Sequence, residues 1–435
     1  MELQAYLKLV VRVLIIASVL LGAIFRYART FPSVPAWFGS APWVLLLLTA
    51  ALAFLVFLAE MPAIGLADLA MFALMCLIAL TYLTSTARYG VADQLPFAGN
   101  FLLPIPVFFA VRLDRKFTPE LLETALVPFA LAASGLSLIE FYTDNFGARI
   151  FNFGSYWNEV GNVGYHASAV HYALLGMRNR PWGVLALPES SGALMAALAL
   201  YFCAGRKTPL RLTCMASCIA ATYASGSRTA ILTIAVFGLV MAWHSDLPRL
   251  IKYLSGSVAL IAAVVEVATL TTFYDPQLQI HGFIYLTLQN FWNFISPVQP
   301  TAFVIHLFMG GGGISVANPM TTFTGEVALL NWVAYLGVLP WLVMALLFFF
   351  ASRRYAGASR FLPTWARRIR PAYLLMLAVT FGSLHYDAVS RYPSNVIVAV
   401  ILALLLRPVR DSFPNAAAPV FSAPLAQSNR QLVHP

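Results

Sequence analysis

The sequence predicts an all-α protein that crosses a membrane about twelve times, on three observations. The 435-residue chain is 60% hydrophobic and only 10% charged, whereas a soluble domain carries about a quarter charged residues. Apolar runs of about 15–24 residues recur along it. Its basic residues alternate between successive loops. We expect one membrane domain over residues 1–410 and a disordered cytoplasmic tail over residues 411–435, which is rich in Ala, Pro, Ser, Asn and Gln.

The apolar runs give the expected membrane spans in chain order. The first run contains no small-residue cleavage site, so we expect it to remain as a span rather than be removed as a signal peptide. The expected spans are residues 7–25, 42–59, 63–84, 97–111, 121–142, 190–204, 210–225, 229–243, 255–273, 327–351, 371–385 and 393–407.

The basic residues predict the orientation of these spans. With the amino terminus in the cytoplasm, the expected inner loops hold basic clusters within residues 112–116, 206–211 and 353–370. By the positive-inside rule, both termini are then cytoplasmic. The net charge of +10 reflects this topology, and no nucleic-acid partner is expected. The expected outer side holds Arg26, Arg29, Arg88, Arg149, Arg178, Arg180, Arg228 and Arg391.

Two expected outer segments are long, residues 143–189 and 274–326. The second contains no Lys or Arg but many aromatic residues. Its residues 280–295 can form an amphipathic helix that lies in the membrane interface. A re-entrant loop packed against the helix bundle is the alternative. We therefore expect short interfacial helices in the outer loops.

Three outer arginines indicate a binding site for an anion. Arg228 lies in the short polar turn Ser225-Gly226-Ser227-Arg228-Thr229, and Arg178 and Arg180 directly precede the sixth expected span. An unpaired guanidinium near the apolar zone is costly. Its planar fork matches phosphate oxygens and it stays charged, which suits a diphosphate. The alternative is that these side chains reach the interface and contact lipid headgroups.

His306 and Glu326 are the candidate proton acceptors for a hydroxyl nucleophile. They bracket the run Gly310-Gly311-Gly312-Gly313, where glycine permits close approach of a ligand to the backbone. Gly311 and Gly312 are therefore candidate substrate-binding residues. No Gly-Lys-Ser/Thr follows, so the run is not a nucleotide-binding loop. The alternatives are a flexible hinge for the glycines and ordinary loop hydrogen bonding for His306 and Glu326.

The remaining polar signals are less specific. Trp182 can stack on a sugar ring or belong to the aromatic belt of the membrane interface. Glu266 lies inside the ninth expected span, where a carboxylate is either functional or neutral and bonded to a neighbouring helix. No metal or other cofactor is expected, because the cysteines form no CxxC or Cys/His pattern. They are Cys76, Cys203, Cys214 and Cys218.

The order of these motifs resembles a known superfamily. The element Arg180-Pro181-Trp182-Gly183 opens a span after a long outer loop, and the turn at residues 225–229 follows it. A second long loop leads through the glycine run and Glu326 to Gly337-Val338-Leu339. Over roughly residues 120–350, this order resembles the O-antigen ligases and Wzy-type polysaccharide polymerases of bacterial inner membranes.

The resemblance implies a fold similar to the C-type glycosyltransferases and a site on the periplasmic face. Such proteins transfer a glycan from undecaprenyl diphosphate to an acceptor hydroxyl, with neither nucleotide sugar nor ATP nor metal. Arg180 and Arg228, with Arg178 nearby, would hold the diphosphate, and Ser227 would contact the substrate. His306 or Glu326 would orient or deprotonate the acceptor.

The resemblance leaves the reaction type open between several alternatives. Residues 317–321 lack the histidine of the His-Asn pattern found in many ligases. This departure favours a polymerase, for which lipid-linked glycan is both donor and acceptor and a chain-length regulator is a candidate partner. An O-antigen ligase or a protein O-oligosaccharyltransferase is the alternative with the same chemistry. A secondary transporter or a lipid-linked glycan flippase is the alternative from another class.

Overall fold

The computed structural model describes the helical core of the chain. The described residues are 2–29, 35, 38, 41–60, 64–89, 100–143, 181, 183–185, 188–243, 307–308, 310, 332–333, 336–383 and 387–407. Their regular secondary structure is helical throughout, which confirms the all-α prediction. The ninth expected span and the expected tail lie outside these residues. So do residues 144–180, 274–306 and 311–326 of the two long outer segments.

Each of the other eleven expected spans overlaps a described helix. In the first part of the chain they are α1 (Glu2–Arg29), α2 (Ala41–Glu60), α3 (Leu66–Tyr89), α5 (Pro104–Leu113) and α6 (Pro119–Thr143). In the second part they are α10 (Pro188–Ala204), α11 (Pro209–Ser225), α12 (Arg228–Trp243), α18 (Val338–Phe361), α19 (Pro363–Gly382) and α20 (Ser394–Leu406).

Length and composition identify the chain as a membrane protein. Within the described residues, five helices are long and apolar enough to cross a membrane, namely α1, α2, α3, α6 and α18. Shorter apolar segments lie in α5, α10, α12 and α20. The count of twelve spans and the glycosyltransferase fold stay predictions.

Two helices begin elsewhere than the apolar runs predict. The tenth span was expected from residue 327, but α18 begins at Val338, directly after Gly337 with a φ of +83°. The eleventh was expected from residue 371, but α19 begins at Pro363. Its first turns bury Trp365 and Ile369 and expose Arg367, so this stretch is an amphipathic helix rather than a basic loop.

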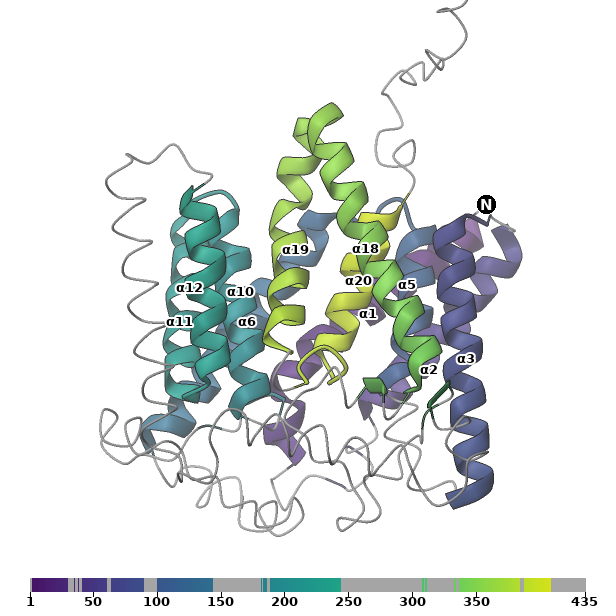
Figure 1. Ribbon diagram of the computed structural model, residues 1–435, viewed down its shortest axis with the longest axis horizontal. Helices are drawn as coiled ribbons and strands as arrows, with labels where there is room; N and C mark the ends of the chain where they lie inside the picture. The colour runs from purple at the N-terminus through teal and green to yellow at the C-terminus, as the bar shows by residue number, and fades with distance from the viewer. Residues whose placement is uncertain are drawn as a thin grey trace, which may run out of the picture.

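The most completely buried helices lie at the centre of the bundle. Every residue of α20 is buried, as expected of a helix that is apolar on all sides. Helix α10 packs against α11, α12 and α19, whereas α20 packs against α5, α18 and α19. Figure 1 shows α6, α10, α11 and α12 on one side and α2, α3 and α5 on the other, with α18, α19 and α20 between them.

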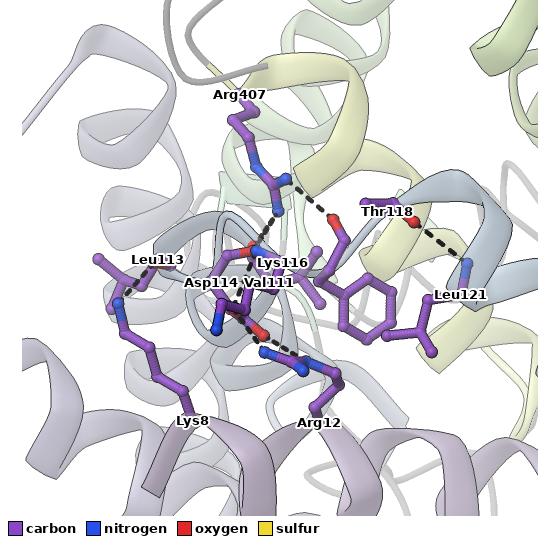
Figure 2. Close-up of polar contacts among 10 residues, drawn as sticks. Lys8, Arg12, Val111, Leu113, Asp114, Lys116, Thr118, Leu121 and Arg407 are labelled. Carbon is purple, nitrogen blue, oxygen red and sulfur yellow. Dashed lines mark hydrogen bonds and ion pairs between the residues drawn. The ribbon is translucent and has the colours of Figure 1, made fainter. Parts of the chain in front are cut away.

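One end of the bundle is held together by ion pairs, and we call it the paired end. Arg12 Nε lies 2.7 Å from Asp114 Oδ2 (Figure 2), and Arg112 Nη2 lies 2.7 Å from Asp68 Oδ2. The pairs Lys8–Glu60 and Arg211–Glu123 lie at the same end. Lys8–Glu60 joins the start of α1 to the end of α2, and Arg12–Asp114 joins α1 to the end of α5. Arg112–Asp68 joins the end of α5 to the start of α3, and Arg211–Glu123 joins the starts of α11 and α6.

Carbonyl groups hold two further arginines at the paired end. Arg407 donates hydrogen bonds to the carbonyl oxygens of Phe117 and Asp114, both at 2.9 Å, as Figure 2 shows. Arg354 donates to the carbonyl of Leu406 at 2.8 Å. Arg12, Arg112, Arg211, Arg354 and Arg407 therefore join helix ends.

Candidate functional site

The opposite end of the bundle contains the turn at residues 225–229, and we call it the Ser227 end. Helices α6, α11 and α19 finish at this end, and α10, α12 and α20 begin there (Figure 1). Helices α10, α12 and α20 thus direct their amino termini, the positive ends of their dipoles, toward this end, and the helices that finish here direct their negative ends toward it. An anion would bind locally, at an individual helix amino terminus.

Local hydrogen bonds fix the turn between α11 and α12. Gly226 ends α11 in the left-handed conformation with a φ of +62°, which glycine adopts without strain. Ser227 is 2% exposed, and its hydroxyl accepts a hydrogen bond from the amide of Ala230 at 3.3 Å. Ser227 is therefore the amino-terminal cap of α12, and Arg228 is the first residue of that helix. A substrate contact by Ser227 stays a prediction.

Gly192 of α10 lies directly against this turn. A Cβ atom at Gly192 would lie 2.9 Å from Ser227 Cβ and would also collide with Ser225 Oγ. Cβ atoms essentially never approach that closely, so only glycine permits the observed packing. The first turn of α10 therefore supports the turn that carries Arg228.

The Arg-x-x-Gly element ends beside the same turn of α10. Gly183 has a φ of +61°, and a Cβ atom there would lie 2.6 Å from Ser191 Cβ. The Ser191 hydroxyl also accepts a hydrogen bond from the amide of Leu185 at 3.0 Å. Gly183 thus packs on Ser191, and the turn at residues 225–229 packs on the adjacent Gly192. The two arginine-bearing elements meet on successive residues of α10.

A third segment, residues 387–393, reaches the same place from the far end of the sequence. Ser190 of α10 donates a hydrogen bond to the carbonyl of Asp387 at 2.8 Å. The hydroxyl of Tyr392 donates to the carbonyl of Ser18 in α1, and burial raises the Tyr392 pKa above its ordinary value. This segment is therefore attached to both α10 and α1.

Two charged residues at this end received no role in the sequence analysis. Glu140, in the last turn of α6, accepts a hydrogen bond from the amide of Gly183 at 3.2 Å. Nη1 of Arg391 donates to the carbonyl of Leu185 at 3.4 Å. A signal existed for both, since each is a charged residue at the expected outer end of an apolar run. Their convergence on residues 183–185 could not be read from the sequence.

Most of the predicted site residues lie outside the described residues. They are Arg178, Arg180, Trp182, His306, Gly311, Gly312 and Glu326, together with the side chain of Arg228. Some neighbours are described. A Cβ atom at Gly337 would collide with the carbonyl of Phe308 and lie 2.6 Å from the amide nitrogen of Gly310. The stretch directly after His306 therefore lies at the start of α18, at the Ser227 end.

A mostly apolar cavity of about 80 Å³ lies between α3, α5, α18 and α20. Its lining includes Met71, Phe348 and Leu402, and toward the Ser227 end Ser390 and Asn395. The side-chain amide of Asn395 donates a hydrogen bond to the carbonyl of Asn100 at 3.0 Å, so this polar group of the lining has a protein partner. Segment 387–393 thus borders the apolar cavity and also contacts α10.

Comparison with known proteins adds no family to this description. The chain matches no protein-family model, and no curated protein matches it. Among the described residues, no group of three or more His, Cys, Asp or Glu is placed to hold a metal ion, and independence from metal stays a prediction.

Proposed function

We propose that this protein polymerises undecaprenyl-diphosphate-linked oligosaccharide repeat units on the periplasmic face of a bacterial inner membrane. One observation carries the proposal. The Arg-x-x-Gly element ending at Gly183 and the turn that begins with Ser225 pack on the adjacent residues Ser191 and Gly192. This packing supports a site shared by Arg228 and by Arg180, which precedes Gly183 by three residues in the sequence, near the positive ends of α10 and α12.

In the proposed reaction, a hydroxyl of one lipid-linked glycan attacks the anomeric carbon of another. The new glycosidic bond forms as the bond between that carbon and the diphosphate oxygen breaks, and the configuration inverts. The hydroxyl proton passes to His306 or Glu326, and undecaprenyl diphosphate leaves. Arg180 and Arg228 stabilise the negative charge that develops on the leaving group, a contribution of several kcal/mol in sites of this kind, roughly 3–4 for one donor.

The departure of residues 317–321 from the ligase pattern supports a polymerase over a ligase. A polymerase uses the same lipid-linked unit as donor and acceptor. A ligase or a protein O-oligosaccharyltransferase would need a different acceptor, and a transporter or flippase would form no glycosidic bond. The acceptor requirement therefore separates these functions by experiment.

The test is a reconstitution of the purified protein in lipid vesicles with lipid-linked repeat units. The units are supplied alone or with lipid A–core, in the presence of EDTA and without ATP. We expect the units to be joined into longer chains in both conditions, as read on a gel. Transfer to lipid A–core without chain growth would instead identify a ligase. Movement of the units across the bilayer without either product would identify a flippase.

A further inference from the structure

Arg391 differs from the buried arginines at the paired end. Its side chain is partly buried and Nε has no hydrogen-bond partner. Among the described residues, its one hydrogen bond is long, 3.4 Å from Nη1 to the carbonyl of Leu185. No carboxylate among these residues forms an ion pair with it. The described part of the chain therefore leaves most of the hydrogen-bonding capacity of this guanidinium unused.

The paired end shows how this protein otherwise satisfies such groups. Arg12 and Arg112 each bind a carboxylate through two nitrogens. Arg354 and Arg407 also have an unpartnered Nε, but each donates to at least two carbonyl groups through its other nitrogens. A partly buried cation with one long contact is costly unless an anion completes its surroundings.

The surroundings of Arg391 place it beside the proposed diphosphate site. It contacts Leu185, whose amide is bonded to Ser191, and Ser191 precedes the Gly192 that supports the Arg228 turn. Asp387, four residues earlier, forms no ion pair with it, and its carboxylate accepts hydrogen bonds from the amide and hydroxyl of Ser390 instead. The anion expected here is therefore external to this segment.

We propose that Arg391 is a third diphosphate ligand and contacts the phosphate group of the lipid substrate that Arg180 or Arg228 leaves uncovered. The inference rests on the proposed function and adds a residue from the last outer loop. The two phosphates offer more oxygen acceptors than two guanidinium groups bind, so oxygen atoms remain for a third guanidinium group. The apolar cavity beside segment 387–393, at about 80 Å³, is too small for a polyprenyl chain, so the probes below distinguish a lipid-linked diphosphate from free pyrophosphate.

The test measures ligand binding by the full chain in lipid nanodiscs, using Arg391→Gln, Arg391→Lys and Arg228→Gln. Glutamine retains a donor for the Leu185 carbonyl but removes the charge. The probes are undecaprenyl diphosphate, undecaprenyl monophosphate and, in solution, inorganic pyrophosphate. Arg360→Gln is the matched control, because Arg360 is exposed on α18 at the paired end.

We expect Arg391→Gln to weaken undecaprenyl diphosphate binding about tenfold, the factor for one charge-assisted contact. Monophosphate binding should fall less, so that the preference for diphosphate decreases. Arg391→Lys should restore part of the affinity. The control should bind as the unaltered protein does, and pyrophosphate should bind more weakly than the lipid in every variant.

Three results would overturn the inference. If Arg391→Gln binds undecaprenyl diphosphate normally while Arg228→Gln binds it weakly, Arg391 is not a ligand, and the proposed function is not contradicted. An equal loss for diphosphate and monophosphate, with a lowered melting temperature, means that Arg391 acts only on the fold. A lack of diphosphate binding by the unaltered protein overturns the inference and the proposed function together.

Discussion

Gly192 at the start of α10 lies so close to Ser227 at the start of α12 that a Cβ atom on it would come within 2.9 Å of Ser227 Cβ. This contact holds the turn that begins α12 and contains Arg228 against α10. Its close approach depends on the absence of a side chain at position 192. A small substitution there tests whether the contact matters for activity.

Replacing Gly192 by Val should displace the Ser225–Ser227 turn, because the new side chain cannot fit beside it. We expect overpacking to cost about 1–3 kcal/mol of stability and chain extension to fall strongly. Melting temperature and polymer length measure the two effects. Gly238→Ala is the control, since a Cβ atom at Gly238 in α12 has no neighbour within 4 Å. If Gly192→Val were as active as Gly238→Ala, the contact between Gly192 and Ser227 would not matter for activity.

Arg228→Ala and Arg180→Ala should each abolish chain extension while the protein remains at normal abundance in the membrane. Arg228→Lys should also fail, because an ammonium group cannot bind two phosphate oxygens in the planar geometry of a guanidinium. A gel of surface polysaccharide and an immunoblot of membranes provide the measurements. Full-length polymer from the alanine variants would contradict the assignment of these two residues.

The Arg12–Asp114 pair should contribute to stability rather than to activity. Removing one partner leaves a buried charge alone, so Arg12→Met or Asp114→Leu should each lower stability by on the order of 3 kcal/mol. The double variant should lose less than the sum of the two single changes. Thermal unfolding in detergent measures each loss. Strictly additive losses would show that the two side chains do not interact.

The two ends of the bundle should lie on opposite sides of the membrane. Lys207 and Tyr142 are exposed, the first in the α10–α11 connection and the second in the last turn of α6. In a cysteine-free protein, we expect a membrane-impermeant maleimide to label Tyr142→Cys in intact spheroplasts. Lys207→Cys should be labelled only after permeabilisation. Labelling of both from the same side would contradict the predicted topology.

The sequence predicted the helices well because long apolar runs leave the backbone few alternatives in a membrane. It placed the start of α19 too late, because Arg367, Arg368 and Arg370 were taken as a loop. The buried positions Trp365, Ala366 and Ile369 alternate with these charges at helical spacing, a pattern that was present in the sequence but was outweighed by the charge.

The candidate site was predictable only in part. Arg228 became a candidate from its local context, since a charged residue in a short turn between apolar runs is conspicuous, and its role stays a prediction. Arg391 was assigned to the outer side but received no role, because its contact with Leu185 joins residues 206 positions apart. Contacts of that kind depend on tertiary packing, and no local pattern encodes them. The roles of His306 and Glu326 stay predictions.

The ion pairs of the paired end have a consequence for how the bundle can move. Lys8–Glu60, Arg12–Asp114, Arg112–Asp68 and Arg211–Glu123 all lie far along the helices from Gly192 and Ser227. Because the four ion pairs lie at the paired end, a separation of α10 from the α11–α12 turn that is confined to the Ser227 end breaks none of them. Under the proposed function a bulky glycan would enter at the Ser227 end, and widening that end would cost packing contacts but no electrostatic bonds among these pairs.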